Sequence, residues 1–171
     1  MLKFESFSKS IIVYHGSRDK IEEVKPGLFT TTNKDGALWY TYNNYDVDTA
    51  YLTTFRLVCD NPLYYENLEG FQKMWLPILD ELGYEYEFDN DDGHGWEFYC
   101  STIEEHSPFE GSNPFDCVYL PGFNEKVLEM GYDCIYGYDV MNNYEIEIYI
   151  ILDTDKITIT KSEVINIKEE Y

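Results

Sequence analysis

Positive charge is scarce in this sequence. It has 12 Lys and Arg residues against 33 Asp and Glu residues, which gives a formal net charge of −21 at pH 7. A field of that sign repels phosphate backbones and anionic lipid headgroups over about one Debye length. The composition therefore argues against nucleic acid as a general partner. It leaves three interpretations open: a solvated surface, a face that attracts a basic protein, and a mimic of DNA.

Long apolar runs and cysteine motifs are also missing. No apolar run reaches the roughly 18 residues of a membrane span, and the N-terminal MLKFESFSKS lacks the apolar stretch of a signal peptide. The four cysteines, Cys59, Cys100, Cys117 and Cys134, form no Cys-x-x-Cys pair and have no histidine at zinc-ligand spacing. We therefore expect no metal site, no membrane partner, and reduced, buried cysteines in a bacterial or host cytoplasm. Only two Ala and two Arg are present, which favours an AT-rich coding genome such as that of a phage or a low-GC bacterium.

Apolar and aromatic residues, in contrast, are plentiful. The hydrophobic fraction is 44% and the aromatic fraction is 18%, with 17 Tyr and 10 Phe. Burial of this much apolar surface offsets the conformational entropy lost on folding, which excludes a disordered chain. A length of 171 residues predicts a single domain over residues 1–171.

Local patterns predict a mixture of strands and helices. A β-branched strand, Ile11–Tyr14, is expected to stop at His15-Gly16, and a short strand, Leu28–Thr31, follows Pro26-Gly27. Asn33 can cap a short helix that runs through Tyr40, and a helical face over Phe71–Leu82 should be broken or kinked at Pro77 and end at Gly83. The stretch Glu145–Leu152 begins with period-two alternation and becomes wholly apolar, as in a strand that enters the core. These elements predict an α+β fold.

One ordered set of residues indicates a catalytic or ligand-binding site. His15-Gly16-Ser17 comes at a predicted strand end, Phe29 follows in a Gly-x-aromatic triplet, and Tyr40 lies eleven residues later. With a late strand that opens with Glu, this order resembles the ADP-ribosyltransferases of the His-Tyr-Glu class, which include diphtheria-type toxins and the poly(ADP-ribose) polymerases. The segment GLFTTTNKDGALWY fits the class pattern of Gly-x-aromatic, ten residues and Tyr, with Phe29 where the class has tyrosine.

Three further segments look like ADP-ribosyltransferase domains of phage and polyvalent proteins: FRLVCDNPL (residues 55–63), EMGYDCIYG (residues 129–137) and EIYIILDTDKI (residues 147–157). The resemblance says little about residues 64–128, which such families fill variably. It implies a split β-sandwich with short flanking helices, in which two small, mostly antiparallel sheets hold NAD between them.

The resemblance also implies a role for each motif residue. His15 would hydrogen-bond the adenosine-side ribose, and the backbone of Gly16, with the Ser17 hydroxyl, would pair with the nicotinamide carboxamide. Tyr40 and Phe29 would clamp the nicotinamide ring, which needs a flat apolar surface. Two of these residues also have a structural interpretation: a turn histidine for His15, and core packing for Tyr40.

The carboxylate is predicted to be Glu147, with Glu145 in reserve. Cleavage of the nicotinamide–ribose bond develops positive charge on the ribose, which a nearby carboxylate stabilises. The class places this Glu five residues before an Asp that aligns with Asp153, but position 148 is Ile, so Glu147 fits with one bulged or inserted residue. Either Glu could instead belong to the solvent face of an edge strand.

The expected function is NAD-dependent mono-ADP-ribosyl transfer to a macromolecule, with release of nicotinamide. The acidic surface makes a protein acceptor, with a basic surface, the first choice. Two alternatives stay open: a catalytically inactive member of the fold that occupies a basic host surface, and NAD hydrolysis, in which water is the acceptor.

Overall fold

The structure is a computed structural model that describes residues 10–44, 48–89, 97–108, 113–141 and 144–166. It divides the chain into two compact units. Unit 1 comprises Met1–Pro62 and Tyr132–Tyr171, and unit 2 comprises Leu63–Gly131. The single domain over residues 1–171 stays a prediction. Unit 2 is inserted between the two segments of unit 1, and each unit is described by itself.

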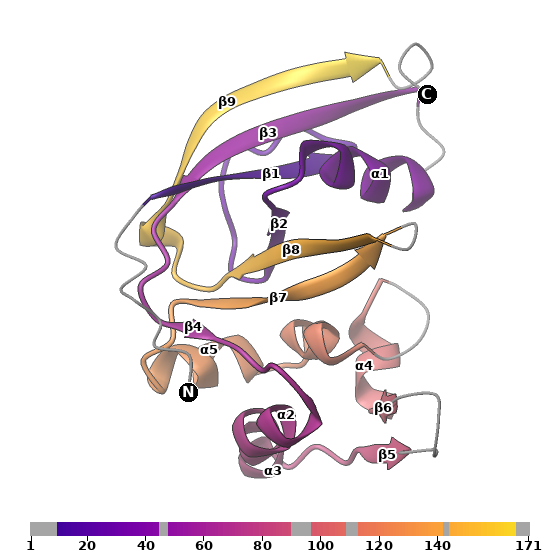
Figure 1. Ribbon diagram of the computed structural model, residues 1–171, viewed down its shortest axis with the longest axis vertical. Helices are drawn as coiled ribbons and strands as arrows, with labels where there is room; N and C mark the ends of the chain where they lie inside the picture. The colour runs from indigo at the N-terminus through magenta and orange to yellow at the C-terminus, as the bar shows by residue number, and fades with distance from the viewer. Residues whose placement is uncertain (1–9, 45–47, 90–96, 109–112, 142–143, 167–171) are drawn as a thin grey trace. The chain divides into compact units, whose positions relative to one another are not determined.

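Unit 1 contains most of a seven-stranded sheet and the 11-residue helix α1 (Figure 1). Its elements are β1 (Ile11–Ser17), β2 (Leu28–Thr31), α1 (Lys34–Asn44), β3 (Thr49–Leu57), β7 (Cys134–Met141), β8 (Tyr144–Ile151), the 3-10 helix η2 (Thr154–Lys156) and β9 (Ile157–Asn166), with β4 (Pro62–Leu63) at the boundary. The strand order is β4-β7-β8-β2-β1-β3-β9, and every pairing whose register is described is antiparallel. The predicted α+β class is confirmed.

The strands β1 and β2 pair at one described position. β1 pairs with β3 at every residue from Ile11 to Ser17, but it pairs with β2 only where Tyr14 lies opposite Thr31. The ladders β1-β3-β9 and β2-β8-β7 therefore meet at one paired position. The sequence predicted two small sheets, and the structure has two ladders within one sheet.

Local signals explain several element boundaries. The Asn33 side chain accepts a hydrogen bond from the Gly36 N–H at 2.9 Å and caps α1, as predicted. The strand β1 is longer than predicted, because its pairing with β3 continues through His15 and Gly16 to Ser17. The strand β8 has nearly the predicted bounds. It is paired with β7 over its whole length, but with β2 only from Ile148 to Ile151. The register with β2 does not reach Glu145 or Glu147, so the edge-strand interpretation of these glutamates stays open.

Unit 2 is built of short helices around an aromatic core. Its elements are α2 (Leu68–Met74), α3 (Leu76–Leu82), β5 (Glu87–Asp89), β6 (Glu97–Tyr99), α4 (Ser101–His106), the 3-10 helix η1 (Pro114–Tyr119) and α5 (Phe123–Glu129). Pro77 lies in the first turn of α3, and Gly83 ends that helix with a φ of 78°, both as predicted. Phe71 and Trp75 are fully buried and stack at 5.6 Å between ring centroids. None of the described helices is long and apolar enough to cross a membrane.

The prediction that all four cysteines are reduced is wrong for two of them. Cys59 and Cys134 form a disulfide, with 6.3 Å between their Cα atoms. The two residues are 75 positions apart in the sequence, and the fold brings them together where β7 begins. Spacing along the chain does not reveal such a pair. Cys100 and Cys117 of unit 2 are buried thiols, as predicted.

Candidate functional site

The motif residues His15, Gly16 and Ser17 form the last part of β1. Gly16 lies opposite Leu52 of β3, and Ser17 lies opposite Tyr51. Alternate residues of an antiparallel strand turn their N–H and C=O groups to opposite sides. Part of the backbone of this segment therefore faces away from β3, toward the side where the described pairing with β2 consists of Tyr14 alone.

Gly16 has a packing role that the sequence did not reveal. A Cβ atom at this position would lie 2.2 Å from the Ala37 carbonyl oxygen and 2.2 Å from Thr41 Oγ1, far inside contact distance. Ala37 and Thr41 belong to α1. The absence of a side chain therefore lets α1 pack directly on β1, besides any approach of a ligand.

The ring of His15 spans the junction between β1 and β2. Its Nδ1 atom lies 2.6 Å from the Phe29 carbonyl oxygen. A carbonyl oxygen only accepts, so Nδ1 carries the proton and Nε2 of the neutral ring is an acceptor. Burial lowers the pKa of His15, and the bond to Phe29 opposes this with a smaller effect. His15 therefore offers a hydrogen-bond acceptor at Nε2.

The lowered pKa of His15 predicts a pH dependence of stability. Because the folded-state pKa lies below the ordinary 6.5, the unfolded chain binds a proton first, and stability is lost as pH falls below 6.5. We expect the free energy of unfolding of the wild type to fall relative to that of His15→Gln as pH is lowered through this range. Urea unfolding of both proteins between about pH 5 and 8 measures the difference. Parallel pH profiles for the two proteins would contradict it.

Ser17 and Phe29 have local partners. The Ser17 hydroxyl donates to the Asp19 carbonyl oxygen at 2.7 Å, so its oxygen still has lone pairs for an amide N–H. Phe29 lies opposite Ile150 of β8 and is partly buried, and its carbonyl group receives the His15 bond.

Tyr40 extends from α1 to β7. Its hydroxyl group donates a hydrogen bond to a carboxylate oxygen of Asp139. Burial, and then the bond to Asp139, raise the pKa of Tyr40, so the phenol stays neutral. Its ring packs edge-on against Trp39, with 5.3 Å between ring centroids. The sequence prediction missed Asp139, because nothing local connects residues 99 positions apart.

The carboxylate of Glu147 is held on both sides. Thr32 donates to Oε2 at 3.0 Å, and the Tyr136 hydroxyl donates to Oε1 at 2.8 Å. Glu147 is partly buried, whereas Glu145 is exposed. Two donors fix the direction of a carboxylate more firmly than solvent does, so the geometry favours Glu147 over Glu145 as the carboxylate of a site.

A second phenol extends this arrangement. The Tyr138 hydroxyl lies 2.7 Å from that of Tyr136. Tyr136 has one proton, which the Glu147 carboxylate must receive, so Tyr138 donates to Tyr136. Burial is the main cause that raises the pKa of Tyr136, and hydrogen bonds to Tyr138 and Glu147 add to it. The sequence prediction missed both tyrosines, although Tyr136 and Tyr138 alternate on β7 as Glu147 and Tyr149 do on β8.

The register separates the predicted site residues between two faces of the sheet. Tyr14, Thr31 and Ile148 lie opposite one another across β1, β2 and β8 and share one face. Side chains alternate along a strand, so His15 and Glu147 point to the other face. Phe29 lies opposite Ile150 and belongs to the first face, as does Asp139, the partner of Tyr40. The structure thus groups His15 with Glu147, and Phe29 with Tyr40.

Unit 1 also has a shallow groove of about 410 Å³ that contains none of the predicted site residues. Its lining residues are Ser10, Arg56, Val58, Asp155, Lys156 and Thr158. Lys156 is engaged in an ion pair with Asp60. This groove therefore gives no support to a role in the predicted chemistry.

Comparisons of the chain with protein-family models, with curated proteins and with solved structures give no match.

Proposed function

We propose that this chain is an NAD-dependent mono-ADP-ribosyltransferase with the split β-sandwich fold of the His-Tyr-Glu class. It transfers ADP-ribose from NAD to a protein in a bacterial or host cytoplasm and releases nicotinamide. The observation that carries the proposal is the Glu147 carboxylate, held by Thr32 and Tyr136 on the same face of the sheet as His15.

The donors and acceptors present fit the two ends of NAD. The Nε2 atom of His15 is an acceptor for a ribose hydroxyl. The end of β1 has backbone groups directed away from β3, which can pair with a carboxamide. Phe29 and Asp139, the partner of the Tyr40 hydroxyl, lie on one face of the sheet, and Phe29 and Tyr40 are each partly buried, which supports their role as a clamp for the nicotinamide ring. NAD would therefore lie along the junction of β1 and β2.

Glu147 would act on the charge that develops during transfer. When the bond between the ribose C1′ and the nicotinamide nitrogen breaks, its electron pair leaves with nicotinamide and positive charge develops on the ribose. A carboxylate whose direction is already fixed stabilises this charge without reorganising. The acceptor then forms a bond to C1′ and releases its proton. Thr32 and Tyr136 would keep both oxygens of Glu147 in place during these steps.

Calorimetric titration of NAD tests the proposal, with two variants of one residue as controls. We expect the wild type to bind NAD, Tyr40→Phe to bind it nearly as well, and Tyr40→Ala to lose binding by about tenfold or more, because only alanine removes the ring. Circular dichroism checks that both variants fold. Absence of NAD binding to the wild type up to about 1 mM would refute the enzyme proposal.

The distribution of charge favours a second candidate function, an acidic binding protein that is catalytically inactive. Unit 2 has 16 acidic residues and only two lysines, so it holds most of the net charge of −21. Such a unit is suited to a basic surface on another protein. Incubation with labelled NAD and a whole-cell lysate separates the candidates. A labelled protein indicates transfer, free ADP-ribose without an adduct indicates hydrolysis, and no consumption of NAD favours the binding protein.

A further inference from the structure

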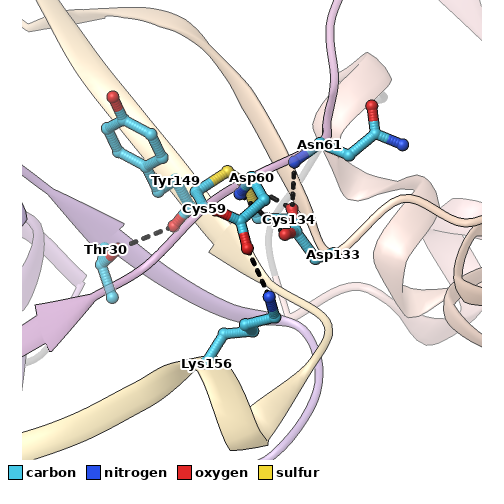
Figure 2. The surroundings of a disulfide bond; sticks show 8 residues. All are labelled: Thr30, Cys59, Asp60, Asn61, Asp133, Cys134, Tyr149 and Lys156. Atoms are coloured by element: carbon cyan, nitrogen blue, oxygen red, sulfur yellow. Dashed lines mark hydrogen bonds and ion pairs between the residues drawn. A yellow bond between two sulfur atoms is a disulfide. The ribbon is translucent and has the colours of Figure 1, made fainter. Parts of the chain in front are cut away.

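The start of β7 is a node at which separate segments of unit 1 meet (Figure 2). The disulfide joins Cys134, the first residue of β7, to Cys59, which follows β3. Beside it, the Asp133 carboxylate accepts hydrogen bonds from the backbone N–H of Asp60 at 2.8 Å and of Asn61 at 3.1 Å. The Asp133 N–H donates in turn to the Asn61 carbonyl oxygen at 3.1 Å. Covalent and polar links thus connect the same two segments.

The end of β8 joins this node as well. The Asp133 carbonyl oxygen accepts hydrogen bonds from the N–H groups of Leu152, at 3.4 Å, and Asp153, at 3.0 Å. Lys156 forms an ion pair with Asp60, as Figure 2 shows. The segments that follow β3 and β8 are therefore both held against residue 133.

The disulfide also closes a covalent loop of the chain that contains all of unit 2. Unit 2 begins at Leu63 and ends at Gly131, so its two connections to unit 1 lie within four residues of Cys59 and within three of Cys134. With the bond formed, the two points at which the chain leaves and re-enters unit 1 stay together. Without it, the hydrogen bonds of Asp133 and strand pairing are noncovalent links that can open.

A short path leads from the disulfide to the candidate site. Cys134 and Tyr136 are two residues apart on β7 and share one face of the sheet. Tyr136 lies opposite Tyr149 of β8 and donates to Glu147. A change in the position of the first residues of β7 therefore moves the donor that orients the Glu147 carboxylate.

We propose that Cys59 and Cys134 form a redox-controlled clasp, which fixes the start of β7 when oxidised and releases it when reduced. A dithiol reductant opens it in two steps. A thiolate of the reductant attacks one sulfur and breaks the S–S bond, and the second thiol then resolves the mixed disulfide. The reductant leaves as a disulfide, and the two cysteines gain two electrons and two protons as thiols.

The surroundings of the pair suit both states. Cys59 Sγ lies 3.5 Å from Asp133 Oδ1, so the thiol formed on reduction has an acceptor already in place. Cys59 is 2% exposed and Cys134 is fully buried, so a reductant reaches the sulfurs only when the node opens locally. A disulfide formed during folding therefore persists in the folded protein. Its reduction is fastest under conditions that favour local unfolding at the start of β7.

Hydrogen exchange followed by mass spectrometry tests the clasp. We expect purified oxidised protein to contain two free thiols, and treatment with dithiothreitol in mild urea, followed by removal of the urea, to give four. After reduction, amides at the start of β7 should exchange faster by about tenfold or more, while those of α3 in unit 2 stay unchanged. Cys59→Ala should behave as the reduced protein does with or without reductant. Cys117→Ala, which removes a buried thiol outside the bond, should keep the response.

Four free thiols in protein folded under oxidising conditions, or equal exchange of the two forms, would overturn the clasp. An activity comparison of the two forms rests on the proposed function, and there we expect the reduced form to transfer ADP-ribose more slowly with little change in NAD affinity. If neither form binds or consumes NAD, the proposed function fails, while thiol counting and hydrogen exchange still decide the clasp.

Discussion

Replacement of Glu147 by glutamine should lower the rate of ADP-ribosyl transfer by at least about 10²-fold, while NAD binding changes little. The amide has nearly the shape of the carboxylate but no negative charge. It therefore loses stabilisation mainly where positive charge develops on the ribose. The amide also replaces one of the two oxygens by an NH2 group, so either Thr32 or Tyr136 loses the acceptor to which it donates in the wild type. Rate measurements with labelled NAD, beside calorimetric titration of NAD, separate transfer from binding.

Glu145→Gln is the matched control, because Glu145 is exposed and lies two residues earlier on the same face of β8. We expect this variant to retain most of its transfer rate. If Glu145→Gln loses activity and Glu147→Gln keeps it, the catalytic carboxylate is Glu145 and not Glu147. If both variants lose NAD binding with the fold intact, the carboxylates act in binding, and the transition-state argument fails.

Much of the local structure could be predicted, because its causes lie close together in the sequence. Asn33 caps α1 through a bond to the N–H three residues later, and Pro77 lies in the first turn of α3, where its ring prevents continuation of α2. The positive φ of Gly83 ends the same helix. The strand β8 combines alternation with a β-branched apolar run, a pattern that few other structures accommodate.

The partners of the candidate site residues could not be predicted, because each depends on strand pairing between distant parts of the chain. Thr32 and Glu147 are 115 positions apart, and Tyr40 and Asp139 are 99 positions apart. The sequence indicates that Glu147 lies on a strand, but the donors that orient it follow from the register between β8 and its neighbours. The disulfide was missed for the same reason, since only the sheet brings residues 59 and 134 together.

The register also changes the interpretation of the predicted site. Spacing alone placed the motif residues in one pocket. Strand alternation divides them between a His15 and Glu147 face and a Phe29 and Tyr40 face. A hydrogen bond between the His15 ring and the Phe29 carbonyl group links the two groups at the junction of β1 and β2. A ligand that uses both groups must therefore lie at that junction, which makes the end of β1 the part of the site most sensitive to change.

Gly16→Ala should destabilise the protein by about 1–3 kcal/mol. The added methyl group would meet the Ala37 carbonyl oxygen and Thr41 Oγ1, each at 2.2 Å, and the first of these is helix backbone. Relief of the clash requires α1 to move away from β1, which exposes part of the cluster of Ala37, Leu38 and Leu52. Chemical denaturation followed by tryptophan fluorescence measures the loss.

Gly36→Ala is the control, because Gly36 belongs to α1, the helix that Gly16 contacts. Its Cβ would lie 3.3 Å from Ile146 Cδ1, the end of a flexible side chain that can turn aside, and alanine is the better helix former. We expect the stability of this variant to change by less than about 1 kcal/mol. A Gly16→Ala protein with unchanged stability would show that α1 can move away from β1 without loss of unfolding free energy. If that protein also failed to bind NAD, the glycine would serve the ligand and not the packing of α1 on β1.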